Sequence, residues 1–180
     1  MSIKALWQIL AVLTAVVLMI LFPIMNTFER EDDLIRLQML DQLDYFVSKV
    51  KQSGTISRRD YELFSSKLNQ LGIPFEITIE HYKQIYVPVY EDPLDFTSFH
   101  GKIQRAEELF SDAEIKARLF PIETPEQGKD YTMSKGDYIS VSVKSKVKSK
   151  HQKLRSMLLG GEQEAFFYAK LGGVIQNEAK

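Results

Sequence analysis

The chain has 180 residues, which is enough for one membrane segment and one further domain with a core of its own. Hydrophobic residues make up 44% of the sequence and charged residues 26%, an ordinary globular composition, and a formal net charge of -1 gives no overall attraction to nucleic acid or anionic lipid. The chain contains no cysteine, which excludes disulfides, thiolate metal ligands and a cysteine nucleophile.

The N-terminal segment at residues 5–25 is uncharged and strongly apolar. As a helix that rises about 1.5 Å per residue it spans roughly 30 Å, the thickness of the hydrocarbon core of a bilayer. The segment runs into the bulky residues Phe22, Pro23 and Ile24 instead of the small residues of a cleavage site, which favours an uncleaved anchor over a signal peptide. The sequence therefore predicts a single-pass protein of the cell membrane.

The charges that flank this segment predict its orientation. Lys4 precedes it, and a mostly acidic cluster follows it: Glu29, Arg30, Glu31, Asp32 and Asp33. Under the positive-inside rule the N-terminus stays in the cytoplasm and the rest of the chain is exported, although with so few positive charges the inverted orientation remains an alternative. We expect a cytoplasmic tip and anchor over residues 1–28 and an extracytoplasmic domain over residues 29–180.

After the anchor, apolar residues recur at every third or fourth position, as on one face of an amphipathic helix. They are Leu34, Ile35, Met39, Leu43, Phe46 and Val50. No strong helix breaker lies at residues 26–33, so this stem is expected to continue the membrane helix, but Pro23 removes one backbone hydrogen bond and leaves the continuity at that point open. We predict that these residues pack on the chain's own domain and on partner subunits, which makes them candidate interaction residues.

The next segments predict a helix followed by a hairpin. Ser57 is a typical N-cap for the helix. Apolar and polar residues then alternate at residues 75–79 and again at residues 85–89, on either side of a turn expected near Lys83. Pro88 favours an edge strand, because proline cannot donate a hydrogen bond to a neighbouring strand.

The remaining sequence predicts two short helices and two strands. Ser111 and Glu114 form a capping-box pattern at the start of a helix that ends near Phe120. There follow a loop at residues 125–129, a half-buried strand at residues 137–147 and a helix at residues 151–159. A last strand is expected at residues 166–175, with a bulge or turn at Gly172 and Gly173. The expected fold class is α+β, with the long helix and the short helices packed on a small, mostly antiparallel sheet.

Lysines follow one another at every second position near the end of the first of these two strands. If the strand persists, Lys144, Lys146 and Lys148 share one face, which could meet an anionic envelope polymer, lipid headgroups or an acidic partner. The alternative is an exposed edge strand that its lysines protect from aggregation. No aromatic residues lie between these lysines, so nucleic acid is not an expected partner.

The sequence contains no pattern typical of a catalytic or metal site. His81, His100 and His151 are too far apart to pair on a helix, and His81 continues a strand pattern, where we expect it at the margin of the core. Clustered carboxylates at Glu91, Asp92 and Asp95 could hold calcium, but their spacing differs from an EF-hand loop and an Asp-Pro turn explains them. We expect no cofactor, no metal and no catalysis.

Four stretches carry a resemblance to a known family: YEDPLDFTSFHGK at residues 90–102, LFP at residues 119–121, KGDYISVSVKS at residues 135–145 and LGGVIQNE at residues 171–178. Together with the membrane helix and the amphipathic stem, the chain resembles the TadE-like and pilin-like proteins of tight-adherence (Flp) pilus systems in Gram-positive bacteria (Firmicutes). The resemblance implies a pilus-associated or secretion-associated subunit whose helix packs with other subunits. The apolar helix lacks the acidic residue of processed pilins, which favours a permanently anchored accessory protein.

The sequence therefore predicts a membrane-anchored, pilin-like structural or accessory subunit of a pilus or secretion-type surface assembly. Its expected partners are the lipid bilayer and other membrane or pilus-assembly subunits, identical or different. A free-standing anchored module that binds an envelope polymer or an acidic partner is the alternative, and an exported enzyme is a more distant one because no nucleophile, base or metal cluster can be named.

Overall fold

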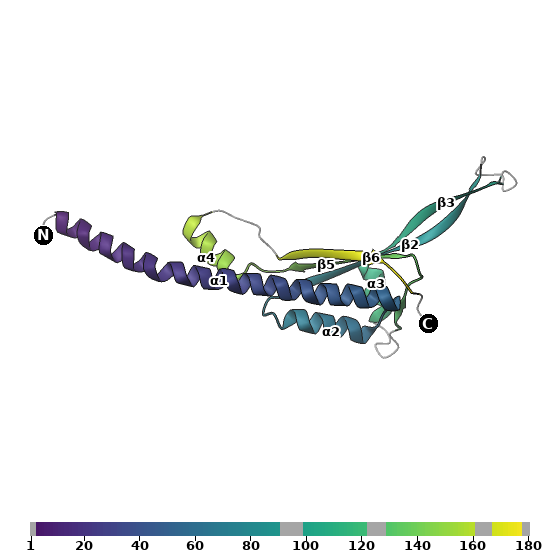
Figure 1. Cartoon of the computed structure of the whole chain (residues 1–180), viewed down its shortest axis with the longest axis horizontal. Coiled ribbons are helices and arrows are strands. Elements are labelled where there is room, and N and C mark those ends of the chain that lie inside the picture. The colour runs from purple at the N-terminus through teal and green to yellow at the C-terminus, as the bar shows by residue number, and fades with distance from the viewer. Residues whose placement is uncertain (1–2, 91–98, 122–128, 161–166, 178–180) are drawn as a thin grey trace.

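The structure is a computed structural model that describes residues 3–90, 99–121, 129–160 and 167–177. Its main feature is helix α1 (Ile3–Ser53), which runs without a break through Pro23 (Figure 1). The loss of one backbone hydrogen bond at the proline does not end a helix of 51 residues, because the turns on either side keep their own bonds. The segments predicted as anchor and stem are therefore one continuous helix.

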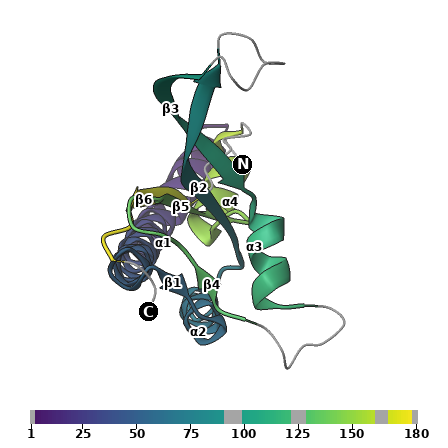
Figure 2. The same ribbon diagram turned by 90° about the vertical axis from the view of Figure 1, so that its right-hand side faces the viewer.

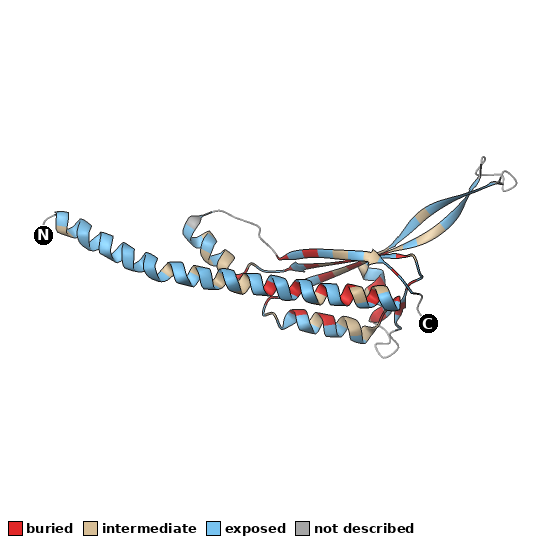
Figure 3. Ribbon diagram, in the orientation of Figure 1, coloured by how far each residue is buried: buried red, intermediate tan, exposed pale blue. Residues whose placement is uncertain are grey.

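The two halves of α1 lie in different surroundings (Figure 3). The N-terminal half is exposed and apolar, and among the described residues α1 is the helix that is long and apolar enough to cross a membrane. The C-terminal half packs one face into the core of the domain, with these residues buried: Ile35, Met39, Leu43, Phe46, Val47 and Val50. One helix thus serves as a candidate membrane span and as the spine of the domain.

A four-stranded antiparallel sheet lies across the C-terminal half of α1. Its strand order is β3 (Phe99–Phe110), β2 (Phe75–Tyr90), β5 (Tyr138–Ser145) and β6 (Tyr168–Val174). Helices α1 and α2 (Arg58–Asn69) cover the same face of the sheet, as Figure 2 shows from the end of the domain. The alternating residues of β2 and β5 that point toward these helices form the core, for example the buried pair Ile79 and Val141.

Smaller elements close the end of the domain that lies away from the anchor. Strands β1 (Thr55–Ile56) and β4 (Tyr131–Thr132) form a separate antiparallel pair, and α3 (Asp112–Leu119) follows β3 directly. The expected α+β fold with a long N-terminal helix and a small antiparallel sheet is confirmed. The predicted helix starts are also confirmed: Ser57 caps α2, and the Ser111 and Glu114 capping box opens α3.

The predicted hairpin with a turn near Lys83 is wrong, because β2 is one strand of 16 residues. Lys83 and Gln84 pair with Glu108 and Glu107 of β3, a strand that the sequence pattern did not reveal. Beyond Tyr82, β2 and β3 pair only with each other, so neither face is covered and no burial pattern marks the sequence there. The strand on which the hairpin prediction rested is real, but its partner comes from later in the chain.

The edge strand considered for the lysines is wrong, because β5 lies inside the sheet, whereas Pro88 does lie where its strand has a single neighbour. Strands β2 and β5 lie inside the sheet, and β3 and β6 form its edges. Pro88 is tolerated because it lies in the part of β2 that pairs with β3 alone. Gly172 and Gly173 sit in regular register within β6 and form no bulge, and a Cβ added to Gly172 would lie 2.6 Å from the carbonyl oxygen of Ile139. Close approach of neighbouring atoms, not a turn, therefore requires glycine at this position.

The packing of α1 on the sheet predicts a difference between its two faces. Leu43 is fully buried, so Leu43→Ala should lower the free energy of unfolding of the domain by about 2–5 kcal/mol. Leu37 is 63% exposed on the opposite face of the same helix, and Leu37→Ala should change that free energy by no more than about 0.5 kcal/mol. Denaturant unfolding of the full chain in mild detergent, followed by near-UV circular dichroism, measures both. Equal losses would contradict the assignment of faces.

Candidate functional site

The most polar buried cluster joins β2, β4 and the start of β5. His81 Nε2 lies 3.0 Å from Asp137 Oδ2, and His81 Nδ1 lies 2.7 Å from the Tyr131 hydroxyl. Asp137 also accepts hydrogen bonds from the backbone N–H groups of Gln84 (3.0 Å) and Ser134 (2.8 Å). The side chains of His81, Asp137 and Tyr131 are buried, so this polar cluster holds three segments of the chain together at the end of the sheet.

The geometry of the cluster assigns each proton. Asp137 is the acceptor at Nε2, so His81 carries its proton there and Nδ1 accepts from the Tyr131 hydroxyl. Burial lowers the pKa of His81 even though Asp137 favours the charged form, and burial raises the pKa of Tyr131 to about 12. His81 is hydrogen-bonded at the margin of the core, where the pairing of β2 with β5 ends, but it is mid-strand and 3% exposed instead of standing at a strand end. With both ring nitrogens occupied, the imidazole is placed to brace the fold and does not reach solvent.

The predicted stem residues separate into two groups. All of them except Leu34 are buried in the chain's own core, so they are not surface residues of the single chain: Ile35, Met39, Leu43, Phe46 and Val50. Leu34 is 60% exposed and lies near Leu37, which the sequence analysis did not single out. We call the exposed pair Leu34 and Leu37 the outer stem face. The spacing of three residues between Leu34 and Leu37 places them on one helical face and could have revealed this pair. Both faces of this stretch are apolar, however, and the sequence alone does not say which one the sheet covers.

The predicted lysine ladder does not form, because β5 ends at Ser145. Lys144 is exposed on the strand, whereas Lys146 and Lys148 lie in the irregular segment that follows, where the backbone N–H of Lys146 donates to the carbonyl of Pro74. The lysines therefore share no strand face, and the basic segment continues into α4 (Lys150–Leu159).

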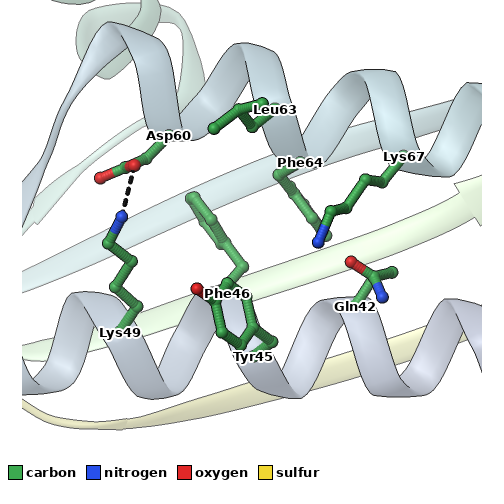
Figure 4. A pocket seen from close by; sticks show the side chains of 8 residues that line it. All are labelled: Gln42, Tyr45, Phe46, Lys49, Asp60, Leu63, Phe64 and Lys67. Atoms are coloured by element: carbon green, nitrogen blue, oxygen red, sulfur yellow. Dashed lines mark hydrogen bonds and ion pairs between the residues drawn. The ribbon is translucent and has the colours of Figure 1, made fainter.

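A narrow hollow lies between α1 and α2 (Figure 4). Phe46 and Phe64 form its floor with their rings stacked 4.5 Å apart, and the Lys49–Asp60 ion pair (2.5 Å) closes one end. Its volume is about 90 Å³, well below the roughly 300 Å³ at which ligand pockets begin. The hollow is therefore the seam of a helix pair and offers no argument for a bound ligand.

A long two-stranded ribbon projects from the domain, formed by β2 beyond Tyr82 and by β3 (Figure 1). Tyr86 is 70% exposed and Ile103 is 64% exposed on one face of it, and Val87 is exposed on the other. A twisted ribbon that exposes apolar side chains on both faces is typical of a segment that packs against another molecule. The ribbon and the outer stem face are the candidate interaction surfaces.

Within the described residues, no group of three or more histidine, aspartate and glutamate side chains could hold a metal ion. The carboxylates considered for calcium, Glu91, Asp92 and Asp95, lie outside the described residues, and so does most of the loop predicted at residues 125–129.

No family model matches the chain, and comparisons with curated proteins and with solved structures yield no significant match. The resemblance to TadE-like and pilin-like proteins therefore stays a prediction that depends on the sequence stretches quoted above.

The polar cluster predicts a dependence of stability on pH. Because the pKa of folded His81 is below its ordinary value of 6.5, the neutral ring contributes its full stability above pH 6.5, and this contribution is lost as the pH falls toward the lower pKa. Carboxyl groups such as Glu80, whose pKa the hydrogen bond from Lys170 lowers, lose their contribution only below 4.5. Thermal unfolding should therefore show a lower melting temperature for the natural chain at about pH 5.5 than at about pH 7.5. The variant His81→Gln should have a lower melting temperature overall, and that temperature should not change with pH in this range.

The cluster also predicts a large cost for one small change. Both carboxylate oxygens of Asp137 accept N–H groups, so Asp137→Asn turns an amide N–H₂ toward a buried donor. We expect a loss of about 3–5 kcal/mol in the free energy of unfolding. The matched change at the exposed residue Asp130, Asp130→Asn, should stay within about 0.5 kcal/mol. Denaturant unfolding of the two variants side by side would contradict this role of Asp137 if their losses were alike.

Proposed function

We propose that the chain is a membrane-anchored, pilin-like structural or accessory subunit of a pilus or secretion-type surface assembly. The observation that carries the proposal is the single helix α1, whose N-terminal half is exposed and apolar and whose C-terminal half is the spine of the domain. A helix with an exposed apolar half needs an apolar environment, and a lipid bilayer of matching thickness supplies one.

The charges around the anchor support a cytoplasmic N-terminus and an extracytoplasmic domain. Lys4 lies before the apolar half of α1, and the acidic residues Glu29, Glu31, Asp32 and Asp33 lie after it on the side of the domain. In this orientation the sheet, the ribbon and the short helices all stand outside the cell. The domain is then presented at the surface on a rigid stem instead of a flexible linker.

The shape and surface of the domain support assembly over catalysis. The outer stem face extends the apolar anchor beyond the membrane, and the ribbon carries exposed apolar residues to the opposite end of the molecule. Two separated apolar surfaces suit a subunit that contacts neighbours in the membrane and at its head. The alternative reading as a polymer-binding module relied on a lysine ladder, and β5 ends before that ladder can form.

Site-directed crosslinking in the native membrane tests the proposal. Because the chain has no cysteine, Leu37→Cys and Tyr86→Cys each carry a photoreactive maleimide at one site. We expect covalent adducts with pilus or secretion subunits, or with a second copy of the chain, identified by mass spectrometry. The exposed residue Asn69 at the end of α2 provides the matched control, Asn69→Cys, which should give fewer adducts.

The outcome distinguishes the parts of the proposal. A chain that alkaline carbonate extracts from the membrane has no anchor, and the proposal fails at its first step. A chain that remains in the membrane but forms no adduct at residue 37 or 86 is not an assembly subunit, and the anchored binding module becomes the better description.

A further inference from the structure

Helix α4 is fastened to α1 at its first turn, on the side of the domain nearest the anchor. The hydroxyl of Ser149, the N-cap of α4, donates to Asp32 Oδ2 (2.5 Å), and Lys150 pairs with Glu31 (3.0 Å). His151 Nδ1 lies 3.6 Å from the same Asp32 carboxylate. These contacts join the acidic residues that follow the anchor to the start of α4.

From this attachment α4 extends toward the anchor end of α1 (Figure 1). Leu21, Met25 and Phe28 lie on the same helical face as Asp32, and all three are partly buried, whereas most residues around them are exposed. The first turn of α4 is attached to α1 at Glu31 and Asp32, and from there α4 rises obliquely away from α1 on the side of the anchor (Figure 1). Helix α4 therefore lies beside the part of α1 where an inserted anchor leaves the bilayer.

Apolar side chains of α4 face outward at this level. Met157 is 83% exposed and Leu158 is 46% exposed, close to the end of the helix. Both lie in the last turn of α4, at the end opposite its attachment to Asp32. Water is an unfavourable environment for these side chains, whereas the boundary between headgroups and acyl chains is a favourable one.

Positive charge is concentrated in the same place. Residues 146–155 contain no acidic residue and five basic ones: Lys146, Lys148, Lys150, Lys153 and Arg155. Among the described residues only Lys150 of this group forms an ion pair. The carboxylates of Glu31 and Asp32, which would oppose an anionic surface, are already engaged by Lys150, Ser149 and His151. The remaining basic side chains are available to anions at the level of the headgroups.

We propose that α4 and the basic segment before it form a second membrane contact, specific for anionic phospholipids. Lys146, Lys148, Lys153 and Arg155 bind the headgroups, and Met157 inserts at the boundary of the acyl chains. The inference rests on the proposed anchor, since α1 must be inserted for α4 to meet lipid. Because Asp32 and Ser149 tie α4 to the stem, this contact sets the orientation of the whole domain relative to the membrane.

Fluorescence quenching in vesicles tests the proposal. Met157→Cys gives the full chain a single cysteine, which is labelled with an environment-sensitive fluorophore and reconstituted into vesicles with brominated acyl chains. We expect the bromolipid to quench the label strongly in phosphatidylcholine vesicles that contain phosphatidylglycerol, and weakly in phosphatidylcholine alone. Adding Lys153→Gln and Arg155→Gln should lower the ratio of inserted to water-exposed label by about fivefold for each residue.

Two controls separate this inference from the anchor itself. A label at Leu13→Cys, within the apolar half of α1, should be quenched in every vesicle, and if it is not, the proposed anchor fails. The exposed lysines Lys102 and Lys135 lie elsewhere on the domain, so Lys102→Gln with Lys135→Gln should leave the label at residue 157 unchanged. With the anchor inserted, an unquenched label at residue 157 overturns the proposal. Equal quenching with and without phosphatidylglycerol overturns its specificity for anionic lipid.

Discussion

The structure depends on the burial of one face of α1 against the sheet. Met39, Leu43 and Val50 are almost fully buried where α1 packs on β5, β6 and α2, and each buried aliphatic side chain contributes roughly 1.5–3 kcal/mol to folding. Since the same helix continues as the apolar N-terminal half, the domain cannot turn independently of that half. A rigid connection between the candidate membrane span and the head follows from this packing and not from a hinge or linker.

This use of the inner face limits where other molecules can bind. The residues that look most like an interaction stripe in the sequence are buried in the domain's own core, whereas the outer stem face, the ribbon and α4 each expose apolar side chains. The three surfaces lie on different elements, with Met157 on α4, Leu37 on α1 and Tyr86 on β2. Such a division suits an assembly component better than a binding module with a single site.

Two sets of polar contacts hold the accessory elements in place. At the end away from the predicted anchor, Asp137 accepts hydrogen bonds from His81 and from two backbone N–H groups. These bonds hold the base of the ribbon and strand β4 in place. At the other end, Asp32 accepts a hydrogen bond from the Ser149 hydroxyl and so positions α4. In both places a buried or half-buried carboxylate organises segments that are far apart in the chain, because a charge removed from water must be matched by several donors.

The sequence by itself determined the features that depend on local patterns. The apolar run at residues 5–25, the N-cap at Ser57, the capping box at Ser111 and the α+β class follow from periodicity and turn chemistry, which neighbouring residues carry. Only the tertiary structure decided what depends on distant partners. It decided that β2 continues through Lys83 because β3 pairs with it, and that the lysines after Ser145 leave the sheet. It also decided that Leu34 and Leu37 lie outside the core, because the sheet covers the other apolar face of α1. A helix that is apolar on both sides has the same sequence pattern whichever face is covered.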